Sequence, residues 1–289
     1  MSLSRRRFLE LSALSVVAAA VAKTSACSSE DSSSSSTTSS VIVVGGGLSG
    51  LVSAYLLGGG RTKVTVLEAN THLGGRVHTE RWPNGQISEL GFEEFFDEDT
   101  YPDIWWLVRE LALQDQVTRY RGSMGAYLRD EYIPPGSYSK WIRDLPWSAD
   151  TDPDDFNSMI SHVSGGVGQL SMPHDAASYA ALDSESMKDW ISRSYDRSGS
   201  GDVDWLTSIF LQPEIGVPSD RTSAAYAILN LWIWYNSDLY HLRDGNDQFI
   251  SRLVDKLPPN SVTLDAKVSA VRNLPDNEGV EVEYTDRSG

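Results

Sequence analysis

The hydrophobic and polar positions of the chain follow different patterns in successive stretches. An apolar run at residues 11–22 is followed by a tract that is almost entirely Ser and Thr up to Ser40. The β-branched residues 41–44 then predict a buried parallel strand, and Lys63–Leu67 predicts a second strand. We expect a helix over Leu48–Leu57 between them. The order strand, helix, strand is typical of an α/β fold with a parallel sheet.

The long middle stretch, residues 99–240, has a mainly helical pattern. Apolar side chains spaced by three and four residues predict a helix over residues 102–111, and residues 126–134 predict a hairpin. Capping side chains before Trp190 and near Thr222 predict the starts of two further helices. The Trp and Tyr side chains after Thr222 can form core or line an apolar substrate tunnel, and core is the commoner arrangement.

The C-terminal stretch, residues 241–289, returns to an alternation of helix and strand. A helix is expected over residues 249–256, and strands are expected over residues 261–264 and 266–271. Residues 279–284 alternate as in a strand, and the turn-forming residues after them predict a partner strand that this chain lacks. Such a strand would leave an exposed sheet edge, so we expect the chain to be the N-terminal portion of a longer protein.

The start of the chain resembles an export signal. Arg5, Arg6 and Arg7 precede the apolar run, which is shorter than the roughly 20 residues that cross a bilayer. A basic start, a short apolar stretch and small residues after it are typical of a signal peptide, and the arginines followed by Phe-Leu resemble the twin-arginine type. Residues 1–26 are therefore expected to engage the export machinery and to direct the protein to a periplasmic or other extracytoplasmic location. The alternative is an N-terminal helix packed on the domain.

Cys27, the only cysteine, begins a polar tether at residues 27–40. A cysteine at a cleavage point, followed by a flexible Ser-rich tract, resembles the lipid anchor of bacterial lipoproteins. The alternative is cleavage after residues 20–22, which leaves Cys27 as an unused thiol. A single cysteine excludes an intramolecular disulfide framework and a cysteine-rich zinc site, and we expect no bound metal.

The composition narrows the possible classes of function. Hydrophobic residues make up 40% of the chain, which excludes wholesale disorder. The chain has 24 Lys and Arg against 40 Asp and Glu, for a formal net charge of −16. This acidic balance argues against a nucleic-acid-binding surface, which needs clustered basic side chains.

A glycine-rich turn follows the first strand. Gly45, Gly47 and Gly50 form the pattern G-x-G-x-x-G: the first allows a tight turn, the second lets a pyrophosphate approach, and the third lets the helix pack on the strand. The helix N-terminus points N–H groups at the phosphates. Glu68, about 20 residues further on, can accept hydrogen bonds from ribose hydroxyls. The residues assigned to a dinucleotide in this stretch are Gly45, Gly46, Gly47, Leu48, Ser49, Gly50, Glu68 and Ala69.

A second glycine pair indicates which dinucleotide is bound. Gly74 and Gly75 follow Glu68 closely and lead into Arg76. This arrangement resembles the FAD-binding start of the flavin amine oxidase superfamily, which includes monoamine, polyamine and L-amino acid oxidases. The resemblance implies that Gly74, Gly75 and Arg76 lie against the FAD phosphates and the flavin edge. Asn70 stands at a position where arginine is frequent in the family, as does His72.

The resemblance continues after the second turn. It implies that Gly91, Phe92, Glu93 and Glu94 pass close to the flavin, and that the backbone of Val268 pairs with the adenine ring. Glu94 stands where some L-amino acid oxidases carry an arginine for the substrate carboxylate. The resemblance therefore favours a cationic amine over an α-amino acid. The alternative is that the two neighbouring glutamates are solvated loop acids.

The resemblance also implies a fold and a function. The fold is α/β: a Rossmann-like FAD-binding domain of the glutathione-reductase type, formed by residues 41–98 and 241–289, with an inserted α+β substrate domain at residues 99–240. The C-terminal part of both domains would lie outside this chain. The implied function is that of an FAD-dependent oxidoreductase that oxidises a small-molecule amine to an imine and passes electrons to oxygen or another acceptor. No catalytic residue is assigned within the chain.

Two alternatives to this function stay open at the level of sequence. A flavin desaturase or dehydrogenase acting on a hydrophobic substrate, as in phytoene desaturases and protoporphyrinogen oxidases, shares the FAD-binding start. The chain can also be an inactive truncated product, or a binding subunit that another polypeptide completes.

Overall fold

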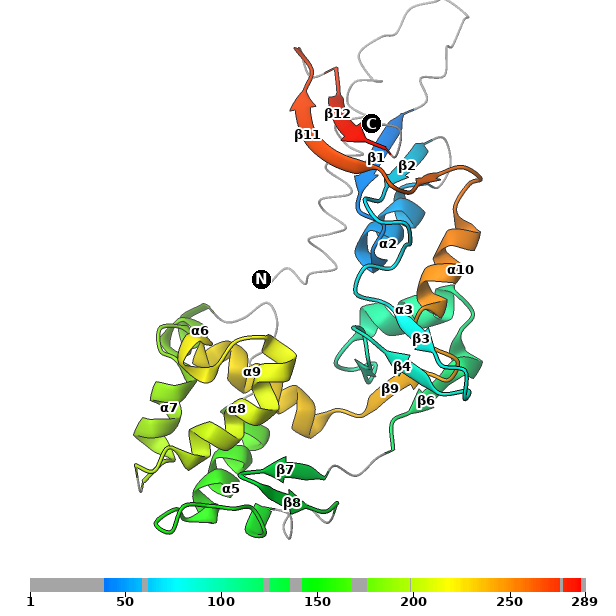
Figure 1. Ribbon diagram of the computed structural model, residues 1–289. Helices are drawn as coiled ribbons and strands as arrows, with labels where there is room; N and C mark the ends of the chain where they lie inside the picture. The colour runs from blue at the N-terminus through cyan, green and yellow to red at the C-terminus, as the bar shows by residue number, and fades with distance from the viewer. Residues whose placement is uncertain are drawn as a thin grey trace, which may run out of the picture. The chain divides into compact units, whose positions relative to one another are not determined.

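The computed structural model describes most of the chain after the Ser-rich tract. The described residues are 39–58, 62–121, 125–135, 142–167, 176–197, 199–275 and 278–286. They form two compact units (Figure 1). We call Ser33–Tyr120 together with Asp238–Gly289 the α/β unit, and Arg121–Ser237 the helical unit. The expected signal peptide and Cys27 lie outside the described residues.

The α/β unit contains a parallel sheet with the strand order β1–β2–β10. These strands span Ser40–Val44, Lys63–Leu67 and Val262–Thr263. Helix α2, Leu48–Leu57, connects β1 to β2 and packs against both. The predicted strands, the helix between them and the parallel pairing of β1 with β2 are confirmed.

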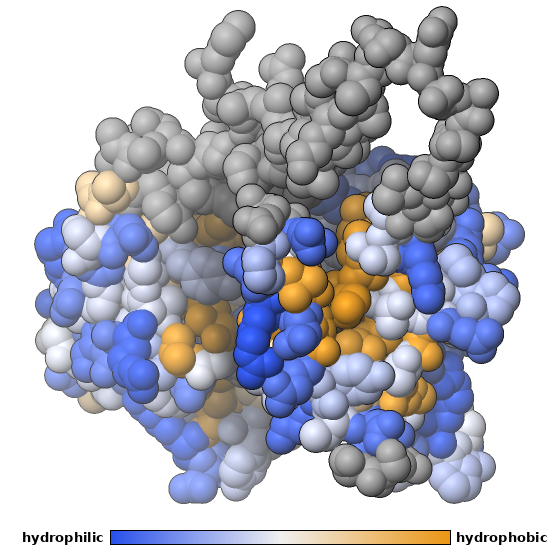
Figure 2. All heavy atoms as spheres, turned by 90° about the horizontal axis from the view of Figure 1, so that it is seen from above, coloured by the Kyte–Doolittle hydropathy of each residue, from blue (hydrophilic) through white to orange (hydrophobic). Residues whose placement is uncertain are grey.

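The prediction that β1 is buried is wrong. Among the residues that the structure describes, β1 pairs with β2 alone and lies at the edge of the sheet. Its side chains Ile42 and Val44 are 40% and 55% exposed. A β-branched run indicates a buried strand only where both of its faces are covered, as in a complete parallel α/β sheet. On the face of the molecule shown in Figure 2, hydrophobic side chains are visible among hydrophilic ones.

Short antiparallel strands and further helices complete the centre of the α/β unit. The antiparallel pairs are β3 (Thr79–Arg81) with β4 (Ile87–Glu89), and β9 (Leu239–Leu242) with both β5 (Phe95–Phe96) and β6 (Val117–Arg119). The helical segments are α3 (Pro102–Glu110), the 3-10 turn η1 (Gln114–Gln116) and α10 (Gln248–Lys256). Helix α10 lies beside α2 (Figure 1). Residues 99–120, which the sequence analysis assigned to the substrate domain, lie in the α/β unit, where β6 pairs with β9.

An antiparallel hairpin, β11 with β12, ends the described chain. The two strands span Lys267–Asn273 and Val280–Thr285. The last strand therefore pairs with the strand before it, whereas the further partner strand that the turn after it predicts stays a prediction. The alternating pattern of residues 279–284 identifies a strand, but it carries no information about the neighbour that the strand joins.

The helical unit surrounds a hydrophobic core of its own. The predicted hairpin is confirmed as β7 (Ala126–Leu128) and β8 (Glu131–Ile133). The helical segments are α5 (Pro153–His162), the π-helical η2 (Val163–Val167), α6 (Ala176–Asp183), α7 (Met187–Ser194), α8 (Asp202–Ile215), the 3-10 turn η3 (Ser219–Arg221) and α9 (Ala224–Asn236). Ser186 and Ser223 cap α7 and α9, as predicted. Within the described part of the chain, no helix has the length and apolar character needed to cross a membrane.

Helix α9 supplies core rather than an open apolar lining. Leu231 is buried in the core of the helical unit, Trp232 packs against that core, and Leu229 is also buried. Tyr226, by contrast, is 47% exposed at the first turn of the helix. The apolar side chains after Thr222 therefore form core, and the opposite face of the helix is exposed to solvent.

A buried carboxylate joins the β7–β8 turn to the start of α8. The Asp202 side chain is 2% exposed, and its Oδ1 accepts a hydrogen bond from Arg129 at 2.5 Å. Its other oxygen accepts the Ser148 N–H at 2.6 Å and the Thr151 hydroxyl at 2.9 Å. Arg129 also lies over the Trp205 ring at 4.1 Å. Burial alone would raise the pKa of Asp202, but these hydrogen bonds outweigh it and lower the pKa to about 2.

We predict that Asp202→Asn destabilises the protein by about 2 kcal/mol at neutral pH, because Arg129 loses its charged partner. The stabilisation by Asp202 should be fully present above the ordinary pKa of 3.8 and should be lost as the pH falls towards about 2. Urea unfolding followed by Trp fluorescence over this pH range measures both effects. Arg193→Gln, which breaks the exposed pair with Glu185, is the control and should cost less than about 1 kcal/mol. Equal losses in the two variants would contradict the assignment.

Candidate cofactor-binding site

The turn after β1 has the geometry that its glycines predict. Gly45 has φ of +100°, a region that favours glycine, and its N–H donates to the Leu67 carbonyl at 2.8 Å. A Cβ on Gly50 would collide with the carbonyl oxygen of Gly45. Helix α2 begins at Leu48, and its N-cap residue, Gly47, has no side chain to accept the first N–H groups of the helix. These N–H groups can therefore bind an anion.

The second glycine turn lies directly against the first. The Gly74 N–H donates to the Gly46 carbonyl at 2.9 Å, and Gly47 and Gly74 form an isolated parallel bridge. Gly74 has φ of +108°, and a Cβ there would collide with the carbonyl oxygen of Val77. A Cβ on Gly75 would lie 3.6 Å from the Gly47 Cα. The structure thus brings together two glycine groups that are far apart in the sequence.

The space beside Gly47 has the properties that a pyrophosphate requires. The nearest atom to a Cβ built on Gly47 is the Gly74 carbonyl oxygen at 3.8 Å, so the glycine leaves an open cradle. The free N–H groups at the start of α2 border this cradle and supply donors together with the positive end of the helix dipole. An alanine methyl group would fit there without a clash, and it would take the space left for a phosphate.

Glu68 holds the first turn to the end of β2. Its side chain is 7% exposed, and Oε2 accepts the Gly46 N–H at 2.6 Å. Oε1 accepts both the Asn70 N–H at 2.8 Å and the Asn70 side-chain amide at 2.9 Å. Burial would raise the pKa of Glu68, but the backbone hydrogen bonds from Asn70 and Gly46 outweigh it and lower the pKa. The carboxylate is therefore ionised at neutral pH.

Asn70 is a contributor to the site that the sequence analysis did not identify. It was noted only as a departure from an arginine that is frequent in the family. Its position two residues after a strand-ending acid was the available signal, because Asn side chains bond readily to neighbouring groups in turns. Ala69, between Glu68 and Asn70, is exposed.

The segment around Gly91 lies alongside the residues that follow the second turn. The Phe92 N–H donates to the Arg76 carbonyl at 2.9 Å, and a Cβ on Gly91 would collide with the same oxygen. Gly91 thus permits a close backbone approach to Arg76, and its expected approach to the flavin stays a prediction. The Arg76 and Glu93 side chains are exposed, whereas Glu94 is half-buried.

The segment that contains Val268 also reaches the end of β2. The Ala266 N–H donates to the Glu68 carbonyl at 2.8 Å, and the Asp265 N–H donates to the Asn70 carbonyl at 3.1 Å. Val268 follows two residues later in β11, where it pairs with Tyr284. This strand therefore begins next to the acid that the sequence analysis assigned to the ribose.

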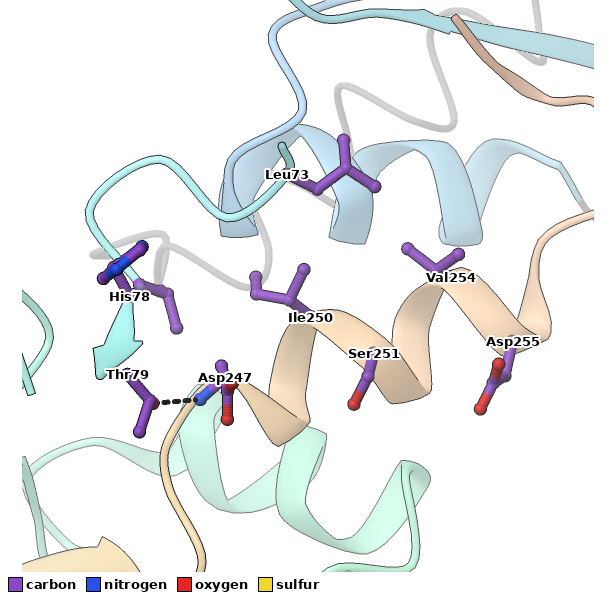
Figure 3. Close-up of a pocket in the computed structure, with 9 residues that line it drawn as sticks. Leu73, His78, Thr79, Asp247, Ile250, Ser251, Val254 and Asp255 are labelled. Carbon is purple, nitrogen blue, oxygen red and sulfur yellow. Dashed lines mark hydrogen bonds between the residues drawn. The ribbon is translucent and has the colours of Figure 1, made fainter. Parts of the chain in front are cut away.

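An open cavity of about 400 Å³ lies between the second glycine turn and α10. Figure 3 shows Leu73 on one side, with Ile250 and Val254 facing it from α10. Thr79 and Asp247 close one end and are joined by a hydrogen bond of 3.1 Å. Among the described residues, no group of three or more His, Cys, Asp or Glu side chains is placed to hold a metal ion.

Comparison with known proteins identifies the family. Residues 48–289 match the family described as flavin containing amine oxidoreductase, a match that begins at the first residue of α2. The chain belongs to this family, and its cofactor is FAD. A comparison with curated protein sequences finds no match.

Solved structures of amine oxidases share the fold. A wild-type putrescine oxidase bound to putrescine is 21% identical, with a TM-score of 0.59, over 85% of this chain and 54% of its own. Cyclohexylamine oxidase from Brevibacterium oxydans IH-35A is 21% identical, with a TM-score of 0.63, over 86% of this chain and 55% of its own. The chain therefore spans just over half the length of these structures.

We predict that Gly47→Ala folds normally and binds FAD about 10- to 100-fold more weakly, because the methyl group takes the space of the pyrophosphate. Flavin absorbance of the purified full-length protein, together with its melting temperature, measures both effects. Gly50→Ala is the matched variant: its methyl group collides with the Gly45 carbonyl, so it should lower the melting temperature itself. A Gly47→Ala protein that retains FAD as the wild type does would contradict this placement of the phosphates.

Proposed function

We propose that the full-length protein is an FAD-dependent oxidoreductase that oxidises an amine to an imine. The observation that carries the proposal is the bridge between Gly47 and Gly74, which makes an open, donor-rich cradle in a chain of the flavin-containing amine oxidoreductase family. An open space beside the second glycine of such a turn lets a pyrophosphate approach the backbone.

In this proposal the α/β unit binds and orients the cofactor. The N–H groups at the start of α2, beside Gly47, bind the pyrophosphate. The carboxylate of Glu68 has about four acceptor positions, three of which are taken by Gly46 and Asn70, so one remains for a ribose hydroxyl. The backbone at Val268 follows the segment that contacts Glu68, which supports a place for the adenine beside it.

The flavin side of the site is proposed to lie along residues 91–94. Gly91 and Phe92 contact the backbone of Arg76, the residue that follows the second glycine turn, and this supports a path from the phosphates to the flavin edge. Bound FAD would supply the hydride acceptor for the carbon that bears the amine. Water would hydrolyse the released imine, and the electrons would pass to oxygen or another acceptor.

The proposed substrate class is a cationic amine. A carboxylate at Glu94 attracts an ammonium group and repels the carboxylate of an α-amino acid. The structural neighbours named for oxidation of putrescine and of cyclohexylamine support an amine without a carboxylate. No residue of this chain is proposed as a catalytic acid or base.

The proposal predicts that the full-length protein, loaded with FAD, releases hydrogen peroxide or reduces an electron-accepting dye when supplied with alkyl amines. A coupled peroxidase assay and a dye assay with the same amine panel measure both routes. Gly47→Ala is the control and should lose the activity together with FAD. Turnover of isoprenoids or porphyrins, with none of any amine, would replace this proposal with a desaturase or dehydrogenase function.

We also propose that residues 1–26 export the protein and that Cys27 carries a lipid anchor. The support is the basic, apolar and small-residue order of the N-terminus, with the cysteine at its end. Cys27→Ser should release the protein from membranes into the soluble extracytoplasmic fraction, because the thiol that takes the lipid is absent. Fractionation of cells with an antibody against the protein measures this. Unchanged membrane association of the Cys27→Ser protein would contradict the anchor.

A further inference from the structure

Asn246, a polar residue with no exposed surface, lies two residues before the first residue of α10. Its side-chain amide donates to the carbonyl oxygens of Phe92 and Glu93, at 2.8 Å and 2.9 Å. Its side-chain oxygen accepts the Leu242 N–H at 2.9 Å. These hydrogen bonds require an asparagine at this buried position. An aspartate would place a carboxylate oxygen against both carbonyl oxygens. A leucine could neither donate to the carbonyls nor accept the Leu242 N–H.

Glu89 and Thr79 fix the backbone on the other side of Asn246. The Asn246 N–H donates to Glu89 Oε1 at 2.8 Å, and the Thr79 hydroxyl donates to Glu89 Oε2 at 2.7 Å. The Asp247 N–H donates in turn to the Thr79 oxygen at 3.1 Å (Figure 3). Gly245, with φ of +109°, allows this approach, since a Cβ there would lie 2.6 Å from the Thr79 methyl group. We call Thr79, Glu89 and Asn246 the polar junction.

Backbone contacts connect the polar junction to the glycine turns. The Leu90 N–H donates to the His78 carbonyl at 2.8 Å, and the Phe92 N–H donates to the Arg76 carbonyl at 2.9 Å. Within residues 90–93, N–H groups thus bond to the segment that follows the second glycine turn, and carbonyl groups bond to Asn246. Asn246 is distant in the sequence from the segment that it holds, since 154 positions separate it from Phe92.

We propose that Asn246 is a positioning residue that sets the path of residues 91–93 along the flavin. The inference rests on the proposed function, in which this segment borders the flavin edge of bound FAD. Asn246 itself touches neither cofactor nor substrate. Its hydrogen bonds determine where the Phe92 and Glu93 carbonyls point. They thereby fix the position of the backbone that faces the flavin ring. The junction therefore tunes the electrostatic surroundings of the flavin rather than binding the dinucleotide phosphates.

The test replaces Asn246 by aspartate in the full-length FAD-bound protein. Asn246→Asp keeps the shape and the acceptor for Leu242, but it turns the donor that faces the two carbonyls into an acceptor. We expect a shifted flavin visible absorbance and circular dichroism spectrum, a shifted midpoint potential, and FAD dissociation that is about tenfold faster. Asn230→Asp, which makes the same change at an amide on α9, should leave all three unchanged.

A second pair of variants keeps the inference testable if Asn246→Asp does not fold. Thr79→Val removes the hydroxyl at constant shape and should shift the flavin spectrum and potential in the same direction, whereas Thr79→Ser retains the hydroxyl and should restore them. Variants that hold FAD with the wild-type spectrum and potential, and lose only thermal stability, would overturn the inference. A wild-type protein that binds no FAD would instead overturn the proposed function, so the two failures are distinguishable.

Discussion

The close approach of two glycine turns is the constraint on which the rest of the α/β unit depends. The Gly46 carbonyl and the Gly74 N–H can meet at 2.9 Å only because no side chain stands between the two backbones. Glu68 fixes the first turn by accepting the Gly46 N–H. This hydrogen bond connects the turn after β1 to the end of β2. The direction of α2, the cradle beside Gly47 and the position of the segment after the second turn all follow from this contact.

Signals that are local in the sequence predicted the corresponding parts of the structure well. The bounds of β2 and α2, the β7–β8 hairpin and the serine caps of α7 and α9 all depend on residues within one or two turns of each other. The glycines of the first turn were identifiable for the same reason, because a backbone at φ of +100° restricts the residue type at Gly45 itself. The family match at residues 48–289 agrees with the resemblance that the second glycine pair carries.

Features that depend on residues far apart in the sequence could not be predicted from local sequence patterns. The exposure of β1 depends on what covers the sheet, and the partner of β12 depends on topology, so neither follows from hydrophobic alternation. The bonds of Asn246 to Phe92 and Glu93 join the two segments of the α/β unit, and a single asparagine before a helix gives no sign of such a partner. Glu68 was recognised as an acid at a strand end, but its hydrogen bonds to the protein required the folded turn.

A crystal structure of the full-length protein with FAD tests the central claim most directly. The account predicts that the pyrophosphate oxygens lie within hydrogen-bonding distance of the N–H groups at the start of α2, in the space between Gly47 and the Gly74–Gly75 turn. It also predicts that a ribose hydroxyl donates to the Glu68 carboxylate. A pyrophosphate bound elsewhere on the α/β unit, with the space beside Gly47 filled by solvent, would contradict it.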